Sequence, residues 1–313
     1  MALFGKKSKP EESSSTAALD EGPADPRHVQ LELTHVDRYE IIAPIGTGGM
    51  GTVYKAIDRQ RDLTVAVKVL DRRYDLDKRR RRRDYLGREI MIAASLDHPN
   101  IIRMHKEIIV QEDTNGNMRR CLLMELVDGP NLRKHINDRD LSIKEMIEVC
   151  KKLCTGLNFL HQHNVVHRDV KPENFLLTRD LTCVKIVDFG LSKVTGGWRA
   201  LWDKEGGGTR RYMSPEQLAK KKLDARSDIF SFGITMYELF TGRHPCSGGD
   251  TRQVLRQLRS SKYRFESPSK LNPEIPRALD KIILKALRRK PGSRYQSVAE
   301  MLLDLERVAE SRI

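Results

Sequence analysis

Short segments rich in hydrophobic residues occur in the first third of the chain, with turn residues between them. This pattern is typical of strands, and it predicts strands at residues 39–45, 52–58, 63–70, 101–110 and 119–126. Asn115 and Gly116, between the last two segments, predict a hairpin turn. A helical pattern at about residues 82–96 separates the third predicted strand from the fourth.

From Ser142 onward the spacing changes, and hydrophobic residues recur at steps of three and four, as on one face of a helix. The first such helix carries Ile143, Met146, Ile147, Cys150, Leu153, Leu157 and Leu160. Further helices are predicted at residues 227–241, 252–259, 277–287 and 297–310. The pattern therefore predicts an α+β fold in which a small antiparallel β lobe with one main helix, residues 38–126, precedes a larger helical lobe, residues 127–313. A cleft between two such lobes is a natural ligand site.

Residues 1–37 are rich in Ser, Pro, Glu, Asp and Ala, with few large apolar side chains. Such a segment cannot bury enough surface to offset the entropy of ordering it, so we expect a flexible tail. Across all 313 residues, 39% hydrophobic and 32% charged residues indicate a soluble globular protein. We find no apolar run of about 20 residues, which a membrane span would need, and no signal peptide or myristoylation pattern at the start. We expect a cytoplasmic location.

The five cysteines are few and odd in number, which argues against a disulfide framework. Cys150 and Cys154 lie four residues apart on one face of a predicted helix. They could begin a metal site, but no second pair has the spacing of metal ligands. We interpret them as buried apolar thiols.

The net charge of +14 is compatible with a nucleic acid, an anionic lipid or an acidic protein as partner. Part of this charge forms an unbroken basic run, made of Lys78, Arg79, Arg80, Arg81, Arg82 and Arg83. The run is either a solvated surface or a site for an anionic partner. Base-reading or aromatic residues are not interleaved with it, so we predict no specific nucleic-acid binding.

A glycine-rich segment follows the first predicted strand and places Gly46, Gly48 and Gly51 in G-x-G-x-x-G spacing. Glycine lets backbone amides approach phosphate oxygens closely. Dinucleotide-binding folds share this spacing, but a helix follows their glycines. Here the β-branched and aromatic residues of 52–56 predict a strand, which favours a hairpin over a nucleotide.

Lys68 ends an apolar segment, Val65-Ala-Val-Lys68. A lysine at the end of a buried strand needs an anionic partner, and phosphate oxygens or Glu89 on the following predicted helix could supply it. The alternative is an edge-strand lysine that faces solvent.

The most specific signal is His167-Arg-Asp-Val-Lys-Pro-Glu-Asn174, followed downstream by Asp188-Phe-Gly190. These segments fit the pattern H-R-D-x-x-x-x-N and D-F-G. With them, the chain resembles the eukaryotic-like (Hanks-type) protein kinases over residues 39–308. The segment G-T-G-G-M-G-T-V-Y is most similar to the bacterial serine/threonine branch.

The resemblance implies an ATP-dependent serine/threonine kinase that phosphorylates protein substrates, including itself. Asp169 would orient the acceptor hydroxyl and take its proton, and Lys171 would neutralise the γ-phosphate. Asn174 and Asp188 would hold two Mg²⁺ ions, which Mn²⁺ could replace. Lys68, paired with Glu89, would hold the α- and β-phosphates. Thr209 would help to dock the acceptor.

The resemblance also assigns a nucleotide site around these residues. The glycine-rich loop would cover ATP with Ile45, Gly46, Thr47, Gly48, Gly49, Met50, Gly51, Thr52 and Val53. Ala66 and Val53 would enclose the adenine ring. Backbone groups of Glu125 and Val127, after Met124, would bind the adenine edge.

Two further assignments are structural. Glu216, in a Ser214-Pro-Glu segment where the family usually has Ala-Pro-Glu, should pair with Arg294. Asp228 should anchor the backbone of the catalytic loop. In this family, the arginine at the position of Arg168 usually binds a phosphate group that is attached to the activation loop.

Between Thr195 and Thr209 the predicted activation loop contains no Ser or Thr, but it holds Trp198 and Trp202 together with Asp203 and Glu205. We predict that tryptophan docking and these carboxylates order the loop. A phosphate on Ser192 or Thr195 is the alternative. We also predict autophosphorylation of Ser13, Ser14, Ser15 and Thr16 in the tail.

Two other function classes stay open at this point. A pseudokinase scaffold typically lacks Lys68, Asp169 or Asp188, and all three are present. A nucleic-acid-binding protein would need a recognisable nucleic-acid motif, and we find none. Phosphoryl transfer in the presence of Mg²⁺ would separate an active kinase from both alternatives.

Overall fold

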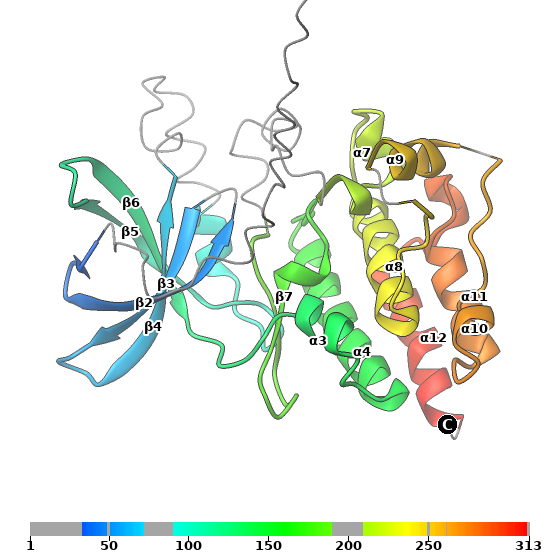
Figure 1. The fold of residues 1–313 in the computed structure, drawn as a ribbon, viewed down its shortest axis with the longest axis horizontal. Helices are drawn as coiled ribbons and strands as arrows, with labels where there is room; N and C mark the ends of the chain where they lie inside the picture. The colour runs from blue at the N-terminus through cyan, green and yellow to red at the C-terminus, as the bar shows by residue number, and fades with distance from the viewer. Residues whose placement is uncertain are drawn as a thin grey trace, which may run out of the picture. The chain divides into compact units, whose positions relative to one another are not determined.

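The computed structural model describes residues 33–48, 51–71, 90–189, 209–248, 251–260 and 262–311. Its first part is an antiparallel sheet of six strands in the order β1-β2-β3-β4-β6-β5. The strands are β1 (His35–Val36), β2 (Tyr39–Gly48), β3 (Gly51–Asp58), β4 (Leu63–Leu70), β5 (Met104–Glu112) and β6 (Met118–Glu125). The elements after β6 are mainly helical (Figure 1). The predicted α+β class, a β sheet followed by a helical part, is confirmed.

Strand β4 lies in the interior of the sheet between β3 and β6, and every residue from Val65 to Leu70 is buried. A strand covered on both faces is expected to be hydrophobic throughout rather than alternating, which explains its sequence. A helical turn at residues 90–95 packs against the sheet through Ile90 and Ala93.

Two strand boundaries differ from the sequence pattern. The fold begins with β1, inside the range assigned to the tail, and Leu33 and Val36 are buried beside it. The strand predicted at 101–110 starts only at Met104, because Ile101 and Ile102 pair with Ile186 of the helical part instead. These three residues connect the sheet to the helices.

The helical part is built around α8 (Ala225–Thr241), of which thirteen residues among seventeen are buried. A helix that is covered on nearly all sides belongs at the centre of a core. Asp224 caps its first turn, and Gly242 ends it in a left-handed conformation with φ 67°. Helix α4 (Ile143–Gln162) starts with a capping box formed by Ser142 and Glu145.

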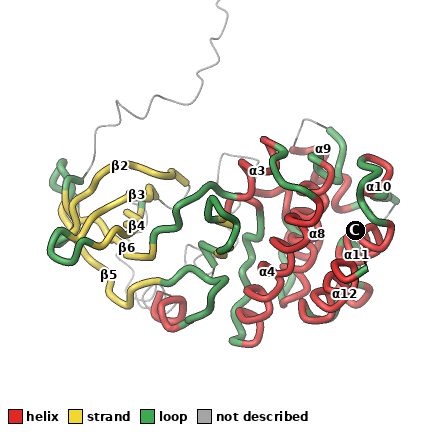
Figure 2. Tube along the Cα trace, turned by 90° about the horizontal axis from the view of Figure 1, so that it is seen from below, coloured by secondary structure: helices red, strands yellow, loops and turns green. Residues whose placement is uncertain are grey.

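Figures 1 and 2 show how the remaining elements surround α4 and α8. The α-helices are α3 (Leu132–Asp138), α7 (Pro215–Leu218), α9 (Thr251–Arg259), α10 (Pro268–Leu271), α11 (Arg277–Ala286) and α12 (Val298–Glu310). The 3-10 turns are η2 (Pro172–Asn174), η3 (Thr209–Tyr212) and η4 (Pro291–Ser293), and a small ribbon consists of β7 (Phe175–Leu177) and β8 (Val184–Ile186). No helix among the described residues has the length and hydrophobicity that crossing a bilayer requires.

Candidate active site

A cleft of about 730 Å³ lies between the sheet and the helical part. It brings together most of the site residues that the sequence predicts, from segments more than a hundred positions apart. The predicted residues that line it are Ile45, Gly46, Thr47, Gly48, Gly51, Val53, Ala66, Lys68, Glu125, Val127, Asp169, Lys171, Asn174 and Asp188.

The glycine-rich loop is the end of a hairpin between β2 and β3, as predicted, with Gly48 paired to Gly51. Gly51 has φ +139°, and a Cβ built there would lie 1.9 Å from the carbonyl oxygen of Val69. Glycine is therefore required at this position by the neighbouring strand β4. A Cβ on Gly46 or Gly48 would meet nothing within 4 Å, so backbone at these two positions is open to the cleft. Thr52 lies in β3 but does not line the cleft, and Gly49 and Met50 lie outside the described residues.

Lys68 stands on β4 with a side chain only 4% exposed, and its Nζ atom lies 2.5 Å from Oδ1 of Asp188. Burial disfavours the ionised form of Asp188, but the charge and hydrogen bond of Lys68 and the charge of Lys171 outweigh it and lower the pKa of Asp188. The buried lysine thus has a carboxylate partner, as the sequence requires. The other expected partner, Glu89, lies outside the described residues.

The predicted catalytic loop places two polar side chains, those of Lys171 and Asn174, against Asp169. The Nζ atom of Lys171 lies 3.0 Å from Oδ2 of Asp169. The side-chain amide of Asn174 donates to the backbone oxygen of Asp169 at 2.6 Å and to its Oδ2 at 3.2 Å. These contacts hold the buried Asp169 carboxylate in one place and leave the carboxamide oxygen of Asn174 as the free end of that group.

The side chain of Asp228 on α8 holds the backbone of the same loop, as predicted. Its carboxylate accepts hydrogen bonds from the backbone N–H groups of His167 and Arg168, each at 2.8 Å, and from Nε2 of His161 at 2.8 Å. Burial works against ionisation of Asp228, yet these donors lower its pKa below the usual value. An ionised, nearly inaccessible carboxylate therefore fixes the backbone one residue before Asp169.

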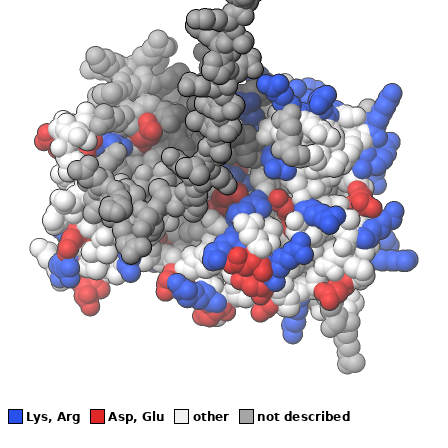
Figure 3. Space-filling view, viewed as in Figure 1, with Lys and Arg blue, Asp and Glu red and all other residues white. Residues whose placement is uncertain are grey.

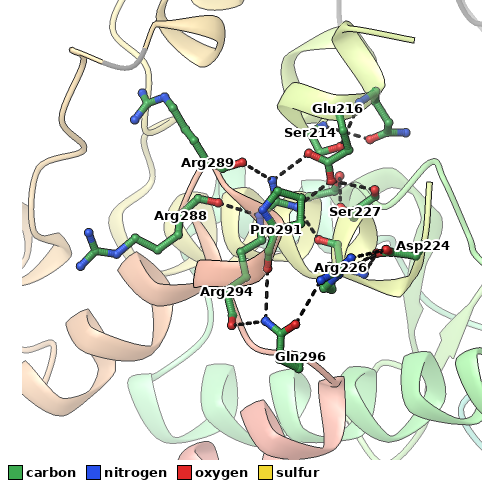
Figure 4. A network of polar contacts seen from close by, with 12 residues as sticks. Ser214, Glu216, Asp224, Arg226, Ser227, Arg288, Arg289, Pro291, Arg294 and Gln296 are labelled. Carbon is green, nitrogen blue, oxygen red and sulfur yellow. Dashed lines mark hydrogen bonds and ion pairs between the residues drawn. The ribbon is translucent and has the colours of Figure 1, made fainter. Parts of the chain in front are cut away.

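The predicted pair of Glu216 and Arg294 is also present, and it is bidentate, with distances of 2.6 and 2.8 Å (Figure 4). The hydroxyl of Ser227 donates to the same carboxylate at 2.8 Å. Arg294 further donates to backbone oxygens of Arg226, Arg288 and Arg289. Ser214 stands where alanine is usual, and it caps α7 through a capping box with Gln217, so the hydroxyl has a structural use.

The segment expected to bind adenine begins at the end of β6, whose last residue is Glu125. The backbone N–H of Glu125 is already used, because it donates to the oxygen of Arg103 at 3.0 Å. The side chain of Glu125 pairs with Lys185 at 2.7 Å. Val127 lines the cleft, and its N–H makes no hydrogen bond within the described part of the chain, so it is an available donor.

The sequence reasoning missed a second polar cluster in the cleft, centred on Arg133. Its guanidinium donates to Glu173 at 2.9 Å, to Glu238 at 3.0 Å and to the hydroxyl of Tyr212, which itself donates to Glu238. Burial and the nearby Glu238 carboxylate raise the pKa of Tyr212. These residues come from α3, η2, η3 and α8, and no spacing in the sequence joins them.

Within the described residues, no group of three or more His, Cys, Asp or Glu side chains could hold a metal ion by itself. Asn174 and Asp188 do line the same cleft and offer one carboxamide and one carboxylate oxygen. Mg²⁺ is typically held by one or two such groups together with phosphate oxygens and water, so the donors fit this ion when it arrives with a nucleotide. Cys150 and Cys154 are fully buried, and burial raises the pKa of both thiols, which confirms their interpretation as core residues.

Some predictions fall on parts of the chain that the structure does not describe. These are residues 1–32 of the tail, the basic run at 78–83, the side chain of Thr209, and the segment with Trp198 and Trp202.

Comparison with known proteins agrees with this arrangement. Residues 39–304 match the protein kinase domain family. The chain is 37% identical over 286 residues to the serine/threonine-protein kinase PknB of Mycolicibacterium smegmatis, an alignment that covers 88% of this chain and 44% of that protein. It is 33% identical over 279 residues to a probable PknB of Lactococcus lactis, with 88% and 43% covered. The chain thus spans less than half the length of these relatives.

Among solved structures, the PknI kinase domain of Mycobacterium tuberculosis superposes with a TM-score of 0.64 at 26% identity, covering 87% of this chain and 97% of that domain. The residues matched by the family, 39–304, include the cleft, the catalytic loop and both anchoring carboxylates, Asp228 and Glu216. The chain belongs to the protein kinase domain family, and within it is similar to the bacterial serine/threonine kinases of the Hanks type.

Proposed function

We propose that this protein transfers the γ-phosphate of ATP to serine or threonine hydroxyls of proteins. One observation carries the proposal: Asp169, with Lys171 and Asn174 against it, shares a cleft with the Lys68–Asp188 pair beneath a glycine hairpin. Phosphoryl transfer needs alignment and neutralisation of charge more than covalent chemistry. A cleft that concentrates cations and carboxylates in fixed positions suits that reaction.

In this proposal Asp169 orients the acceptor hydroxyl and accepts its proton as the new O–P bond forms and the bond between the γ-phosphorus and ADP breaks. Lys171, beside Asp169, faces the transferred phosphoryl group. Lys68 neutralises the phosphates that stay with ADP. The backbone amides of the glycine hairpin and Val127 hold the remainder of the nucleotide.

Asn174 and Asp188 would hold Mg²⁺, or Mn²⁺, which supplies positive charge to the phosphate oxygens when it is bound. The carboxylate of Asp188 would then contact both the ammonium group of Lys68 and the cation. Thr209, by resemblance, would steady the acceptor. Glu89 would be the second partner of Lys68, and Ile45, Thr47, Gly49 and Met50 would cover the nucleotide.

We further propose that residues 38–126 and 127–313 act as the two lobes around the nucleotide and that residues 1–37 are a substrate-bearing tail. A cytoplasmic location agrees with the need for ATP and with five free thiols, which a reducing compartment would keep reduced. The basic run at 78–83 would bind an anionic partner close to the helix that carries Glu89.

Incubation of the purified chain with labelled ATP, Mg²⁺ and a library of Ser- and Thr-containing peptides tests the proposal. We expect label on peptide hydroxyls, none with Asp169→Asn, and none when Mg²⁺ is chelated. A chain that binds ATP without transferring label, in the presence of either cation, would instead be a scaffold of the pseudokinase class.

A further inference from the structure

Helix α11 separates its charged residues from its hydrophobic ones. The buried positions of the helix are Leu279, Asp280, Ile282, Ile283 and Ala286. The exposed cations are Arg277, Lys281 and Lys285 on the helix and Arg288 two residues after its end. Successive cations are three or four positions apart, so the four side chains share one side of the helix, opposite the buried positions. We call these four residues the α11 strip.

Carboxylates do not neutralise the α11 strip. The helix has one acidic residue, Asp280, and its buried carboxylate accepts hydrogen bonds from the backbone N–H and the hydroxyl of Ser269, at 2.8 and 2.5 Å. Among the described residues, no Asp or Glu forms an ion pair with any member of the strip. The Nζ atom of Lys285 lies 3.8 Å from the centre of the Tyr295 ring, which holds this cation at the surface. Since like charges at this spacing destabilise a helix, the strip keeps its charge at a cost in local stability.

The basic surface extends beyond the α11 strip. Lys290, just after the strip, and Lys270, on the neighbouring α10, are exposed as well. Figure 3 shows Lys and Arg side chains along the right-hand edge of the molecule, where Figure 1 places α10 and α11. The exposed carboxylates in residues 262–290 are those of Glu266 and Glu274. Cations therefore outnumber carboxylates on this surface.

This surface is separate from the cleft. Of the described residues that line the cleft, none belongs to α10 or α11. Helix α11 packs instead against α8, where Gly233 leaves room for Ala286: a Cβ on Gly233 would lie 2.9 Å from that of Ala286. The α11 strip therefore stands on a closely packed helix, and a partner bound to it leaves the cleft open.

We propose that the α11 strip, together with Lys270 and Lys290, binds the anionic surface of a lipid membrane. Clusters of about four to eight Lys or Arg residues on one side of a helix are typical of binding to anionic lipid headgroups, and these residues form a cluster of that size. Lysine and arginine are mixed in the strip, which suits a diffuse layer of phosphates, where charge matters more than the bidentate geometry of arginine. Such a surface binds reversibly, because it has charge attraction without an inserted hydrophobic anchor.

Other anionic partners fit the α11 strip less well. Helix α11 contains no aromatic residue on which the bases of a nucleic acid could stack. A stable interface with an acidic protein typically has a central cluster of buried anchors, among which aromatic side chains are prominent. The only exposed apolar residue of α11 is Ala278, so the strip lacks such anchors. A charged membrane surface requires neither feature.

Co-sedimentation of the purified full chain with vesicles tests the proposal, and it does so whether or not the chain transfers phosphate. One set of vesicles contains phosphatidylserine and phosphatidylcholine in equal parts, and the other contains phosphatidylcholine alone. We expect the wild type to bind the first set and not the second. Binding should weaken as the salt concentration rises, because exposed charges are screened.

Two variants of the α11 strip separate charge from shape. Each cation near an anionic lipid surface strengthens binding about fivefold, so Arg277→Gln/Lys281→Gln/Arg288→Gln should bind about a hundredfold more weakly than the wild type. Arg277→Lys/Lys281→Arg/Arg288→Lys keeps every charge and should bind like the wild type. All three positions are exposed, so thermal unfolding should change little in either variant.

A further variant controls for the overall charge of the protein. Lys106→Gln/Lys144→Gln/Arg243→Gln removes three exposed cations from β5, α4 and the segment after α8. Its net charge equals that of the α11 glutamine variant, but its strip is intact. We expect it to bind the phosphatidylserine vesicles nearly as tightly as the wild type.

Acetylation of exposed lysines with acetic anhydride, read by mass spectrometry, locates the contact on the wild-type chain. Vesicles that contain phosphatidylserine should slow the acetylation of Lys270, Lys281 and Lys290. The acetylation of Lys106 and Lys144, which are exposed elsewhere, should stay unchanged. Equal protection of all these lysines would contradict a contact through α11.

Several outcomes of the vesicle experiment would overturn the proposal. The wild type could bind both sets of vesicles equally, or the control variant could lose as much binding as the α11 glutamine variant. Wild-type binding by the α11 glutamine variant would assign the contact to another surface, such as the basic run at 78–83. If that variant loses binding to an acidic peptide or to RNA but not to vesicles, the strip serves a different partner. If the chain transfers no phosphate but binds vesicles through α11, the kinase function fails and the membrane surface stands.

Discussion

The ammonium group of Lys68 and the carboxylate of Asp188 lie 2.5 Å apart across the cleft, although 120 positions separate them in the sequence. Lys68 belongs to the sheet and Asp188 follows β8 of the helical part. This pair therefore joins the two sides of the site directly. In the proposed function, the phosphates of the nucleotide would bind where these two charges meet.

Lys68→Met should abolish phosphoryl transfer and leave the fold intact. The change removes a phosphate contact and leaves Asp188 without its strongest cation, but it puts a side chain of similar size at a buried position. Asp169→Asn should have the same effect on activity because it removes the proton acceptor. Labelled-ATP assays measure the loss, and circular dichroism with thermal unfolding checks the fold. Activity within tenfold of the wild type in either variant would contradict the assigned roles.

Arg294→Met should destabilise the protein strongly. Its guanidinium is fully buried in a bidentate pair with Glu216, and removal of one partner leaves an uncompensated buried charge, at a cost of about 3–5 kcal/mol. Urea unfolding at neutral pH measures the change. Arg226→Gln is the matched control, because Arg226 pairs with Asp224 at the surface, and its loss should cost about 1 kcal/mol or less. An equal loss of unfolding free energy in the two variants would show that the buried pair stabilises the protein no more than the surface pair does.

Asp228 should give the protein a specific sensitivity to acid. Its folded pKa lies below the usual value for an aspartate, so its stabilising contribution is fully present above that usual value and is lost as pH falls through the lower folded pKa. At neutral pH, Asp228→Asn should lower the free energy of unfolding by about 2 kcal/mol, typical of hydrogen bonds to a charged group. The difference between variant and wild type should shrink below about pH 4. A difference that stays constant or grows on acidification would contradict this assignment.

Gly51→Ala and Gly46→Ala should differ although both change the same motif. At Gly51 the φ of +139° and the approach to the Val69 oxygen leave no room for a Cβ, so strain of about 1–3 kcal/mol or more is expected. At Gly46 the added Cβ meets nothing, and stability should change by about 0.5 kcal/mol or less. Thermal unfolding of the two variants side by side makes the comparison. If Gly51→Ala unfolds at the wild-type temperature, strands β3 and β4 can move apart enough at this position to accept a Cβ.

The sequence pattern predicted the elements well where hydrophobic residues follow either the strand period or the helix period throughout a segment. Residues 63–70 form β4 as expected, and the step of three and four from Ile143 to Leu160 is the buried face of α4. It failed at residues 101–103, because an apolar pair looks the same whether it joins a sheet or bridges to Ile186. Strand periodicity reports burial and carries no information about which neighbour provides it.

Within the site, short sequence motifs predicted the residues that one loop brings together, such as Asp169, Lys171 and Asn174. The cluster of Arg133, Glu173, Tyr212 and Glu238 was not predictable in this way, because four separate elements contribute one side chain each. Any of these residues alone reads as an ordinary surface or helix residue.

Arg168 leads to the last prediction, which concerns activation. Its backbone is fixed on both sides, since its N–H donates to Asp228 and its oxygen accepts from Gln217 at 2.7 Å. Its Nε atom is buried and has no partner among the described residues. An anion from elsewhere in the chain would complete this group, and a phosphate on the activation loop is the usual source in the family.

The sequence suggests a different source in this protein. Residues 196–208 contain no Ser or Thr, but they include Asp203 and Glu205, together with Trp198 and Trp202 four positions apart. We expect the carboxylates to serve Arg168 and the tryptophans to dock the loop, so that activity depends little on phosphorylation. Phosphatase-treated protein and a Ser192→Ala/Thr195→Ala variant should both phosphorylate an added peptide at nearly the wild-type rate.

The tryptophan variant provides the decisive comparison. Trp198→Ala/Trp202→Ala should lose most of its activity, by about tenfold or more if docking is worth 1.4 kcal/mol, while its unfolding temperature changes little. Normal activity in this variant, combined with loss in the Ser192→Ala/Thr195→Ala variant, would show that a phosphate at a shifted position orders the loop. Arg168→Ala separates the contributions further: it should reduce activity if any anion, phosphate or carboxylate, acts through this arginine, and leave activity unchanged if tryptophan docking acts alone.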